Sequence, residues 1–220
     1  MNTFQINNEA TPPFNFNQKG LMFVPFKKFG KFQSVFDQGK LANKLFMVKT
    51  GMVKIVHVTE SGNQLIREIK TDGEVFGEWK SMFNSNVRFQ NSAITLSANT
   101  EILCLNLSPF GLENVSTLLS DLSQMILDQN ERQQIRYQML LLQSAEYRIK
   151  ENLRELAMKV GQRFGEETLL KVWLSHEDIA LLADTSRQTV TTVMNGLKKS
   201  GKITYSRDRM LFRNLNKIHH

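Results

Sequence analysis

Five polar residues share one face of a predicted helix that begins after Ser186. They are Arg187, Gln188, Thr191, Thr192 and Asn195. The opposite face of the same helix is apolar and consists of Val190, Val193, Met194 and Leu197. An arginine can pair bidentately with guanine, a glutamine pairs with adenine, and a threonine methyl group can contact the methyl group of thymine. These side chains predict a helix that reads base edges in the major groove of DNA.

A second predicted helix stands before this one and is joined to it by a short turn at Asp184 and Thr185. Ser175 is suited to cap its first turn, where Glu177 and Asp178 interact favourably with the helix dipole. Such a helix-turn-helix makes base contacts from the first turns of its second helix. We therefore expect Arg187 and Gln188 to be the main base readers.

A basic hairpin follows the two helices. Two short strands are expected at Ile203–Tyr205 and Met210–Phe212, with the tip at residues 206–209. Hydroxyl groups at helix starts and basic residues on a wing typically hold DNA phosphates. The predicted phosphate contacts are Ser175, Ser186, Thr189, Lys198, Lys199, Arg207 and Arg209.

The charge of the chain is concentrated in the same region. The 220 residues carry a formal net charge of +7, and residues 185–220 hold eight basic residues against one acid, Asp208. The whole surplus therefore lies at the C-terminal end, which favours a polyanionic partner.

Cys104 is the only cysteine, so no intramolecular disulfide and no cysteine-ligated iron–sulfur cluster is expected. No cofactor is predicted, although an unknown small-molecule effector stays open.

The region between residues 31 and 107 predicts β structure. Apolar and polar residues alternate in several short runs that are separated by turns, as in a small barrel or jelly roll.

Residues 112–143 then predict one long helix whose apolar residues recur at spacings of three and four. Such a helix favours a coiled-coil dimer, and packing on its own barrel is the alternative. The N-terminus does not resemble a signal peptide, and no apolar run is long enough to cross a membrane, so a cytoplasmic location is expected.

The order of these parts resembles the CRP/FNR family of bacterial transcription regulators. In the barrel the resemblance rests on Gln38-Gly39, on residues 45–53 and on the run from Gly73 to Glu78, and in the second helix on residues 185–190. It implies an α+β fold: an N-terminal jelly-roll barrel at 1–110, a dimerisation helix at 111–144 and a winged helix-turn-helix at 145–220. It also implies a homodimer that binds double-stranded DNA and RNA polymerase, and no membrane.

The resemblance also implies an effector pocket in the barrel, but with altered residues. In members that bind cyclic AMP, an arginine before a Ser/Thr-Ala pair holds the cyclic phosphate, and Asn91 stands at that position here. Losing such a partner should cost about 2–5 kcal/mol, so cyclic AMP binding is not expected. The alternative is a regulator that responds to a cyclic nucleotide or another small molecule through a phosphate loop rebuilt around Arg88. The candidate pocket residues are Gly77, Glu78, Arg88, Asn91, Ser92, Gln133 and Gln134.

Two other functions compete with DNA-binding regulation. A cyclic-nucleotide-binding module could use its basic end for a different partner. An enzyme is not expected, because the sequence contains no nucleophile elbow, no P-loop and no His-Glu-x-x-His motif.

In the recognition helix, Gln188 replaces the glutamate that many family members have, and Thr192 replaces a second arginine. Arg187 is therefore the base reader that the resemblance supports best.

Overall fold

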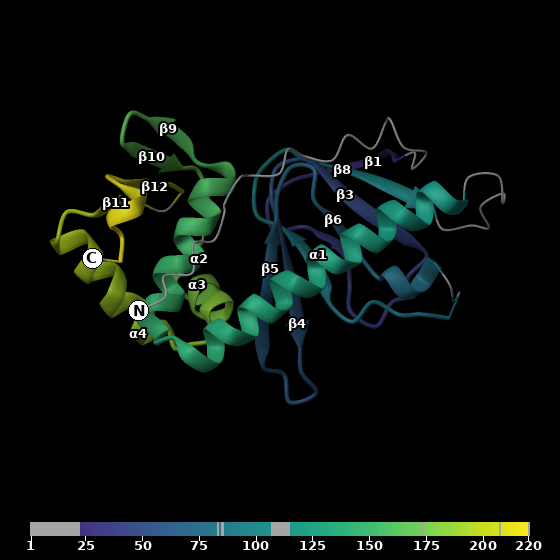
Figure 1. Ribbon diagram of the computed structural model, residues 1–220, viewed down its shortest axis with the longest axis horizontal. Coiled ribbons are helices and arrows are strands. Elements are labelled where there is room, and N and C mark those ends of the chain that lie inside the picture. Colours follow the sequence, from purple (N-terminus) through teal and green to yellow (C-terminus); the bar gives the residue numbers. More distant parts are fainter. Residues whose placement is uncertain are drawn as a thin grey trace.

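The computed structural model describes residues 23–82, 84, 86–106, 115–172, 174–206 and 208–219. Two four-stranded sheets form the N-terminal part, a long helix runs across them, and a smaller helical head with its own sheet forms the C-terminal part (Figure 1). The predicted α+β class, with a jelly-roll barrel and a winged helix-turn-helix, is confirmed. None of the helices within the described residues has the length and apolar character needed to cross a membrane.

The two N-terminal sheets enclose an apolar core. The first sheet has the order β1-β8-β3-β6, with β1 Val24–Phe29, β8 Thr100–Asn106, β3 Lys44–Thr50 and β6 Val75–Gly77. The second has the order β2-β7-β4-β5, with β2 Ser34–Phe36, β7 Ser92–Thr95, β4 Val53–Val58 and β5 Gln64–Lys70. The β region therefore starts at Val24 and not at residue 31. The alternation of apolar residues did not reveal β1, because five of its six residues are exposed.

Aromatic rings fill much of the space between these sheets. Phe36 stacks on Phe89 with ring centroids 3.8 Å apart, and it also stacks on Phe46 and Phe76 at 5.3 and 5.9 Å. Phe46, Phe76 and Phe89 are buried in the same apolar cluster as Cys104. Stacked rings of this kind pack as densely as the rest of a protein core. The barrel interior is thus largely occupied by the protein's own side chains.

The long helix α1 covers Val115–Leu142, and α2 follows at Ala145–Val160. The predicted helix start at residue 112 lies outside the described residues. Ser144 separates the two helices and caps α2 by accepting a hydrogen bond from the Tyr147 N–H. Because the cap residue is extended, the chain changes direction here, and the head is displaced from the axis of α1 (Figure 1).

The head combines helices α3 (His176–Ala183) and α4 (Arg187–Lys199) with a four-stranded sheet of order β11-β12-β10-β9. Strands β11 (Ile203–Tyr205) and β12 (Met210–Phe212) confirm the predicted wing. Strands β9 (Gln162–Phe164) and β10 (Glu167–Leu170) form a hairpin that was not predicted from the sequence. Gly161 follows the last residue of α2. Only glycine fits at this position, because a Cβ atom would lie 2.2 Å from the Ala157 carbonyl oxygen.

Strands β4 and β5 form a wall that the barrel and the head share. On one side of it, Val53 and Ile55 belong to the barrel core. On the other side, Val56, Ile66 and Ile69 belong to an apolar cluster that continues into α2, α3 and α4. The barrel and the head are therefore joined by a common core and not by a linker alone.

Candidate DNA interface and effector cavity

Helix α4 presents the predicted base-reading residues to solvent. Arg187, Gln188, Thr192 and Asn195 are exposed, whereas Val190, Met194 and Leu197 are buried against the rest of the head. Ser186 caps the helix by accepting a hydrogen bond from the Thr189 N–H. The cap places Arg187 in the first turn, where a recognition helix makes its base contacts.

The hydroxyl groups of Thr191 and Thr192 are bound within α4 itself. Thr191 and Thr192 each donate a hydrogen bond to the carbonyl four residues earlier, at 2.9 and 3.1 Å. With their hydroxyl hydrogens held by the helix backbone, these residues can offer a partner a methyl group and a hydroxyl oxygen that only accepts hydrogen bonds. This arrangement suits contact with thymine methyl groups.

The three residues expected to hold phosphates through hydroxyl groups use those groups in helix caps. The Ser175 hydroxyl accepts from the Asp178 N–H at 3.0 Å, and the Ser175 N–H donates to the Asp178 carboxylate at 3.1 Å, which makes a reciprocal capping box at the start of α3. The Ser175 hydroxyl also donates to that carboxylate at 2.7 Å. The hydroxyl groups of Ser186 and Thr189 lie 2.8 Å apart. Their first role is to fix the starts of α3 and α4.

Basic side chains flank α4 on the side of the wing. Lys198 and Lys199 are exposed at the end of α4, and the Lys198 Nζ lies 5.8 Å from the centroid of the Tyr205 ring on β11. Arg209 at the wing tip is 66% exposed and lies 3.5 Å from Asp208. Arg207 lies outside the described residues. The described basic groups lie in the last turn of α4 and at the wing tip, where they can bind phosphates.

His176 and Tyr205 belong to this surface, although sequence reasoning gave them no DNA role. They line a hollow of about 330 Å³ between the start of α3, helix α4 and the wing, with Leu174, Met194 and Met210 among its lining residues. His176 Nδ1 lies 2.9 Å from Thr191 Oγ1. Because the Thr191 hydroxyl donates to the Arg187 carbonyl, Nδ1 must be the donor to Thr191. Burial and the nearby Arg187 lower the pKa of His176.

The barrel contains a second, smaller cavity at the position of the predicted effector pocket. Its volume is about 40 Å³. Three of the predicted residues, Gly77, Glu78 and Asn91, line it. The Asn91 Oδ1 atom is buried and has no hydrogen-bond partner among the described residues. The other lining residues are Phe36, Ile55, Glu68, Lys70, Val75, Phe76 and Gln129.

Four predicted pocket residues do not line this cavity. Arg88 is exposed and donates to the Gly39 carbonyl at 2.8 Å, because Phe89 takes the inward position next to it. Ser92 accepts a hydrogen bond from the Gln38 N–H at 2.9 Å. Gln133 and Gln134 are exposed on α1. These four residues therefore stand outside the lining of this cavity, and their role in effector binding stays a prediction.

Two residues that sequence reasoning missed take part in the cavity instead. On α1 it is Gln129, one helical turn before Gln133, that reaches the barrel and accepts a hydrogen bond from Trp79 Nε1 at 2.9 Å. On β5, Lys70 is 6% exposed and pairs with Glu68 at 2.9 Å. Lys70, the one lysine among the described residues that line the cavity, is therefore already neutralised by an ion pair with Glu68, which lines the cavity too.

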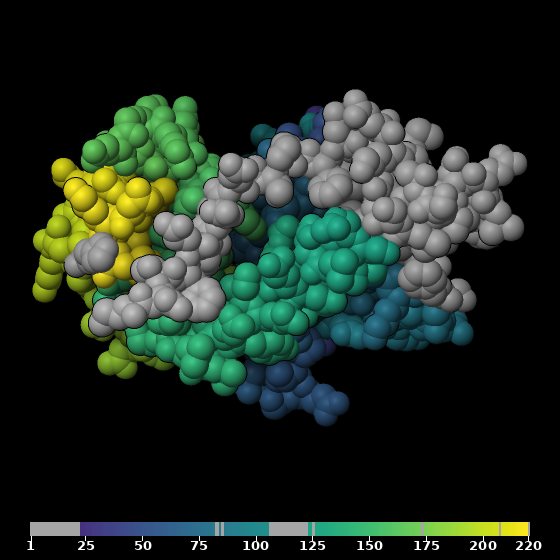
Figure 2. Space-filling view, in the orientation of Figure 1, coloured from purple at the N-terminus to yellow at the C-terminus, as the bar shows by residue number. Residues whose placement is uncertain are grey.

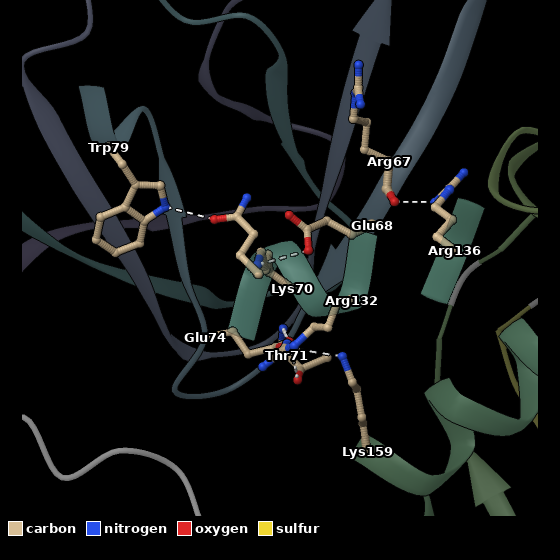
Figure 3. A network of polar contacts seen from close by, with 10 residues as sticks. Arg67, Glu68, Lys70, Thr71, Glu74, Trp79, Arg132, Arg136 and Lys159 are labelled. Atoms are coloured by element: carbon tan, nitrogen blue, oxygen red, sulfur yellow. Dashed lines mark hydrogen bonds and ion pairs between the residues drawn. The ribbon is translucent and has the colours of Figure 1, made fainter. Parts of the chain in front are cut away.

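Glu74 lies between β5 and β6 and connects this part of the barrel to α1 and α2 (Figure 3). Its Oε1 atom lies 2.8 Å from Arg132 on α1 and 3.2 Å from Lys159 on α2. Its Oε2 atom accepts hydrogen bonds from the Thr71 N–H and hydroxyl at 2.8 and 3.0 Å. Burial alone would raise the pKa of Glu74, but Lys159, Lys70, Thr71 and Arg132 together lower it from 4.5 to about 2.

The lowered pKa of Glu74 predicts acid-sensitive stability. Its contribution to the free energy of unfolding is complete above pH 4.5 and is lost as the pH falls toward 2, and a shift of this size corresponds to about 3 kcal/mol. Glu74→Gln should be less stable than the unchanged chain at pH 7 and should approach it in stability near pH 2. Urea denaturation followed by circular dichroism at several pH values tests this. A stability difference that is independent of pH would contradict it.

Comparisons with known proteins match both parts of this chain. Residues 26–111 match the cyclic nucleotide-binding domain family, and residues 139–219 match the Crp-like helix-turn-helix domain family. An anaerobic regulatory protein of Bacillus subtilis is 23% identical over 180 residues, which cover 81% of this chain and 75% of that protein. A cyclic AMP receptor protein of Thermus thermophilus is 25% identical over 171 residues, which cover 77% of this chain and 74% of that protein.

Solved structures share the whole arrangement of domains. FixK2 from Bradyrhizobium japonicum superimposes with a TM-score of 0.72 at 18% identity, covering 90% of this chain and 96% of that chain. A CRP-family transcriptional regulator from Thermus thermophilus superimposes with a TM-score of 0.71 at 20% identity, covering 88% and 95%. Together with the exposed polar face of α4, the two domain matches show that the chain is a DNA-binding transcription regulator of the CRP/FNR family.

Proposed function

We propose that the chain regulates transcription as a homodimer whose barrel does not take cyclic AMP. The observation that carries the second half of this proposal is the size of the barrel cavity. Small-molecule sites in proteins typically measure about 300–1,000 Å³, whereas this cavity measures about 40 Å³. The Phe36 stack and the Glu68–Lys70 ion pair occupy the space around it.

The residue chemistry of the cavity supports the same conclusion. Asn91 stands where an arginine would hold a cyclic phosphate, and the Lys70 ammonium is already paired with Glu68. A phosphate entering the cavity would have to displace Glu68 from Lys70 at an energetic cost. Arg88, the residue considered for a rebuilt phosphate loop, points to Gly39. A cyclic nucleotide would therefore meet neither space nor a free cation in the described part of this cavity.

Isothermal titration calorimetry with cyclic AMP and cyclic GMP tests this part of the proposal. No heat of binding is expected for either nucleotide at millimolar concentration. A dissociation constant in the micromolar range for either one would overturn the proposal and favour the alternative, a regulator that opens its barrel around a small-molecule effector. Asn91→Arg is the matched variant, and it too should fail to bind, since the Phe36 stack still fills the space.

The proposal of a dimer rests on the exposed face of α1. Leu127, Tyr137 and Leu141 are 61%, 58% and 83% exposed. Together with the exposed Asn130 and Gln134 they follow heptad spacing along the helix. The described part of α1 lies along the face of the molecule in view (Figure 2). Burying these side chains against a second copy would remove their apolar surface from water.

Sedimentation equilibrium of the full chain tests the dimer. The unchanged chain should sediment as a dimer, and Leu127→Asp should shift it toward the monomer, because a charge would then lie in the seam. Phe164→Asp is the control, since Phe164 is 52% exposed but stands on β9, away from α1. A monomeric unchanged chain would contradict the proposal. In this proposal the dimer acts in the cytoplasm together with RNA polymerase and has no enzymatic activity.

A further inference from the structure

Arg136 on α1 makes hydrogen bonds to both the barrel and the head. Its Nη1 atom donates to the Arg67 carbonyl (Figure 3). Its Nη2 atom donates to the Ile66 carbonyl at 3.0 Å. The same Nη2 atom donates to the Leu182 carbonyl of α3 at 3.1 Å and lies 3.8 Å from the Asp184 carboxylate. The side chain is 28% exposed. One guanidinium group thus joins β5, α1 and α3.

Two of the three carbonyls that receive Arg136, those of Arg67 and Leu182, stand where the regular pairing of their elements is interrupted or ends. A β-bulge in β5 causes this on the barrel side: Ile55 pairs with Glu68 and Val56 with Ile66, so Arg67 has no opposite residue. On the head side, Leu182 stands in the last turn of α3, where the carbonyl oxygens receive no hydrogen bond from within the helix. Arginine is suited to this position, because its planar group carries five donors in a fixed arrangement.

A second contact holds the other end of α3. Lys54 on β4 lies 2.6 Å from the Asp178 carboxylate, and the two side chains are 17% and 12% exposed. Asp178 belongs to the first turn of α3 and Leu182 to its last turn. The barrel therefore holds α3 at both ends. Since α3 packs directly on α4, these two contacts connect the barrel to the recognition helix through α3.

We propose that Arg136 is a positioning residue that sets the orientation of the recognition helix relative to the barrel and the long helix. Arg136 does not itself contact DNA in this proposal. It acts by fixing the end of α3 to the bulge of β5, on the wall whose other side lines the barrel cavity. The proposal rests on DNA binding by α4 and is independent of whether the barrel binds an effector.

The experiment measures the distance between the barrel and the head in the full chain. Spin labels are attached at Ser61→Cys in the β4–β5 turn and at Ser200→Cys after α4, both of which are exposed, while the native Cys104 is buried. Double electron–electron resonance is then recorded for the labelled chain and for the same chain with Arg136→Met, Arg136→Lys or Arg132→Met. Arg132 is the control, because it stands one turn earlier on α1 and its ion pair is with Glu74 of the barrel.

The labelled chain is diluted into an excess of unlabelled chain, so that a dimer carries only one labelled copy. A single narrow distance distribution is then expected for the parent chain and for Arg132→Met. Arg136→Met should broaden or shift it, and Arg136→Lys should give an intermediate result, because an ammonium group cannot reach all three carbonyls. Circular dichroism confirms that each variant is folded at the temperature of measurement. An unchanged distribution in Arg136→Met would overturn the proposal, even if that variant were less stable.

DNA binding provides a second readout that loss of stability alone would not change. A DNA duplex is selected from a random pool with the unchanged chain, and its two half-sites are then moved apart by two base pairs. The unchanged chain should lose affinity on this insertion, whereas Arg136→Met should bind the original duplex roughly 3- to 30-fold more weakly and be less sensitive to spacing. Equal sensitivity to spacing in both chains would count against the proposal. If no duplex is selected at all, DNA binding itself fails, while the distance measurement still tests Arg136.

Discussion

Arg187→Ala should lower the affinity of the chain for its preferred DNA sequence by about 5- to 150-fold per half-site. The reason is that Arg187 is exposed in the first turn of α4, where its guanidinium can pair with one base in two hydrogen bonds. The affinity for unrelated DNA should fall far less, because only one charge is lost. Fluorescence anisotropy with a selected duplex and an unrelated competitor of the same length measures both quantities.

Two further variants separate base reading from general attraction. Arg187→Lys keeps the charge but loses the paired donors, so it should behave almost like Arg187→Ala toward the preferred sequence. Arg209→Ala, on the exposed wing tip, should instead weaken binding to every duplex and reduce the slope of log K against log salt by about 0.9. If the footprint and the sequence preference survived in Arg187→Ala, the assignment of Arg187 as a base reader would be wrong.

Asp178→Ala should lower the free energy of unfolding by about 3–5 kcal/mol. Asp178 pairs with Lys54 at 2.6 Å in a place where both side chains are mostly buried, and it also completes the capping box with Ser175. Burial alone would raise the pKa of Asp178, but hydrogen bonds from Lys54 and Ser175 lower it. Removing the carboxylate would leave the Lys54 ammonium buried without its partner. Thermal and urea denaturation of the purified chain measure the loss.

The neighbouring Glu177 supplies the control for this prediction. Glu177 is exposed in the same helical turn, so Glu177→Ala should change stability by no more than about 0.5 kcal/mol. Lys54→Met separates the contribution of the ion pair to stability from that of the capping box, because it removes the ion pair and keeps the capping box. A loss of less than about 1 kcal/mol in Asp178→Ala would show that the Lys54 ammonium finds water or another acceptor, contrary to what we expect.

The DNA-binding head could be predicted from the sequence because its signals are local. Caps such as Ser175 and Ser186 lie within three residues of the groups they bond, and the apolar face of α4 follows from helical spacing alone. The hairpin of β9 and β10 could not be predicted in this way. The three residues of β9 are all exposed, so they leave no alternating pattern.

The effector cavity was harder to predict because its lining depends on register between distant segments. The bulge at Arg67 turns Glu68 and Lys70 toward the cavity, and no local pattern in β5 indicates a bulge. On α1, a shift of four residues separates Gln129, which faces the barrel, from Gln133, which does not. In both places the tertiary contact, and not the residue type, decides which polar side chain points inward.

The wall formed by β4 and β5 has a consequence for how the chain melts. Val56 and Ile66 of the barrel share one apolar cluster with Ile179 and Leu182 of the head, so neither part can unfold without exposing apolar surface of the other. Calorimetry should accordingly record one cooperative heat-absorption peak for both parts, instead of a separate transition for each. A regulator built in this way would lose its barrel and its DNA-binding head at the same temperature.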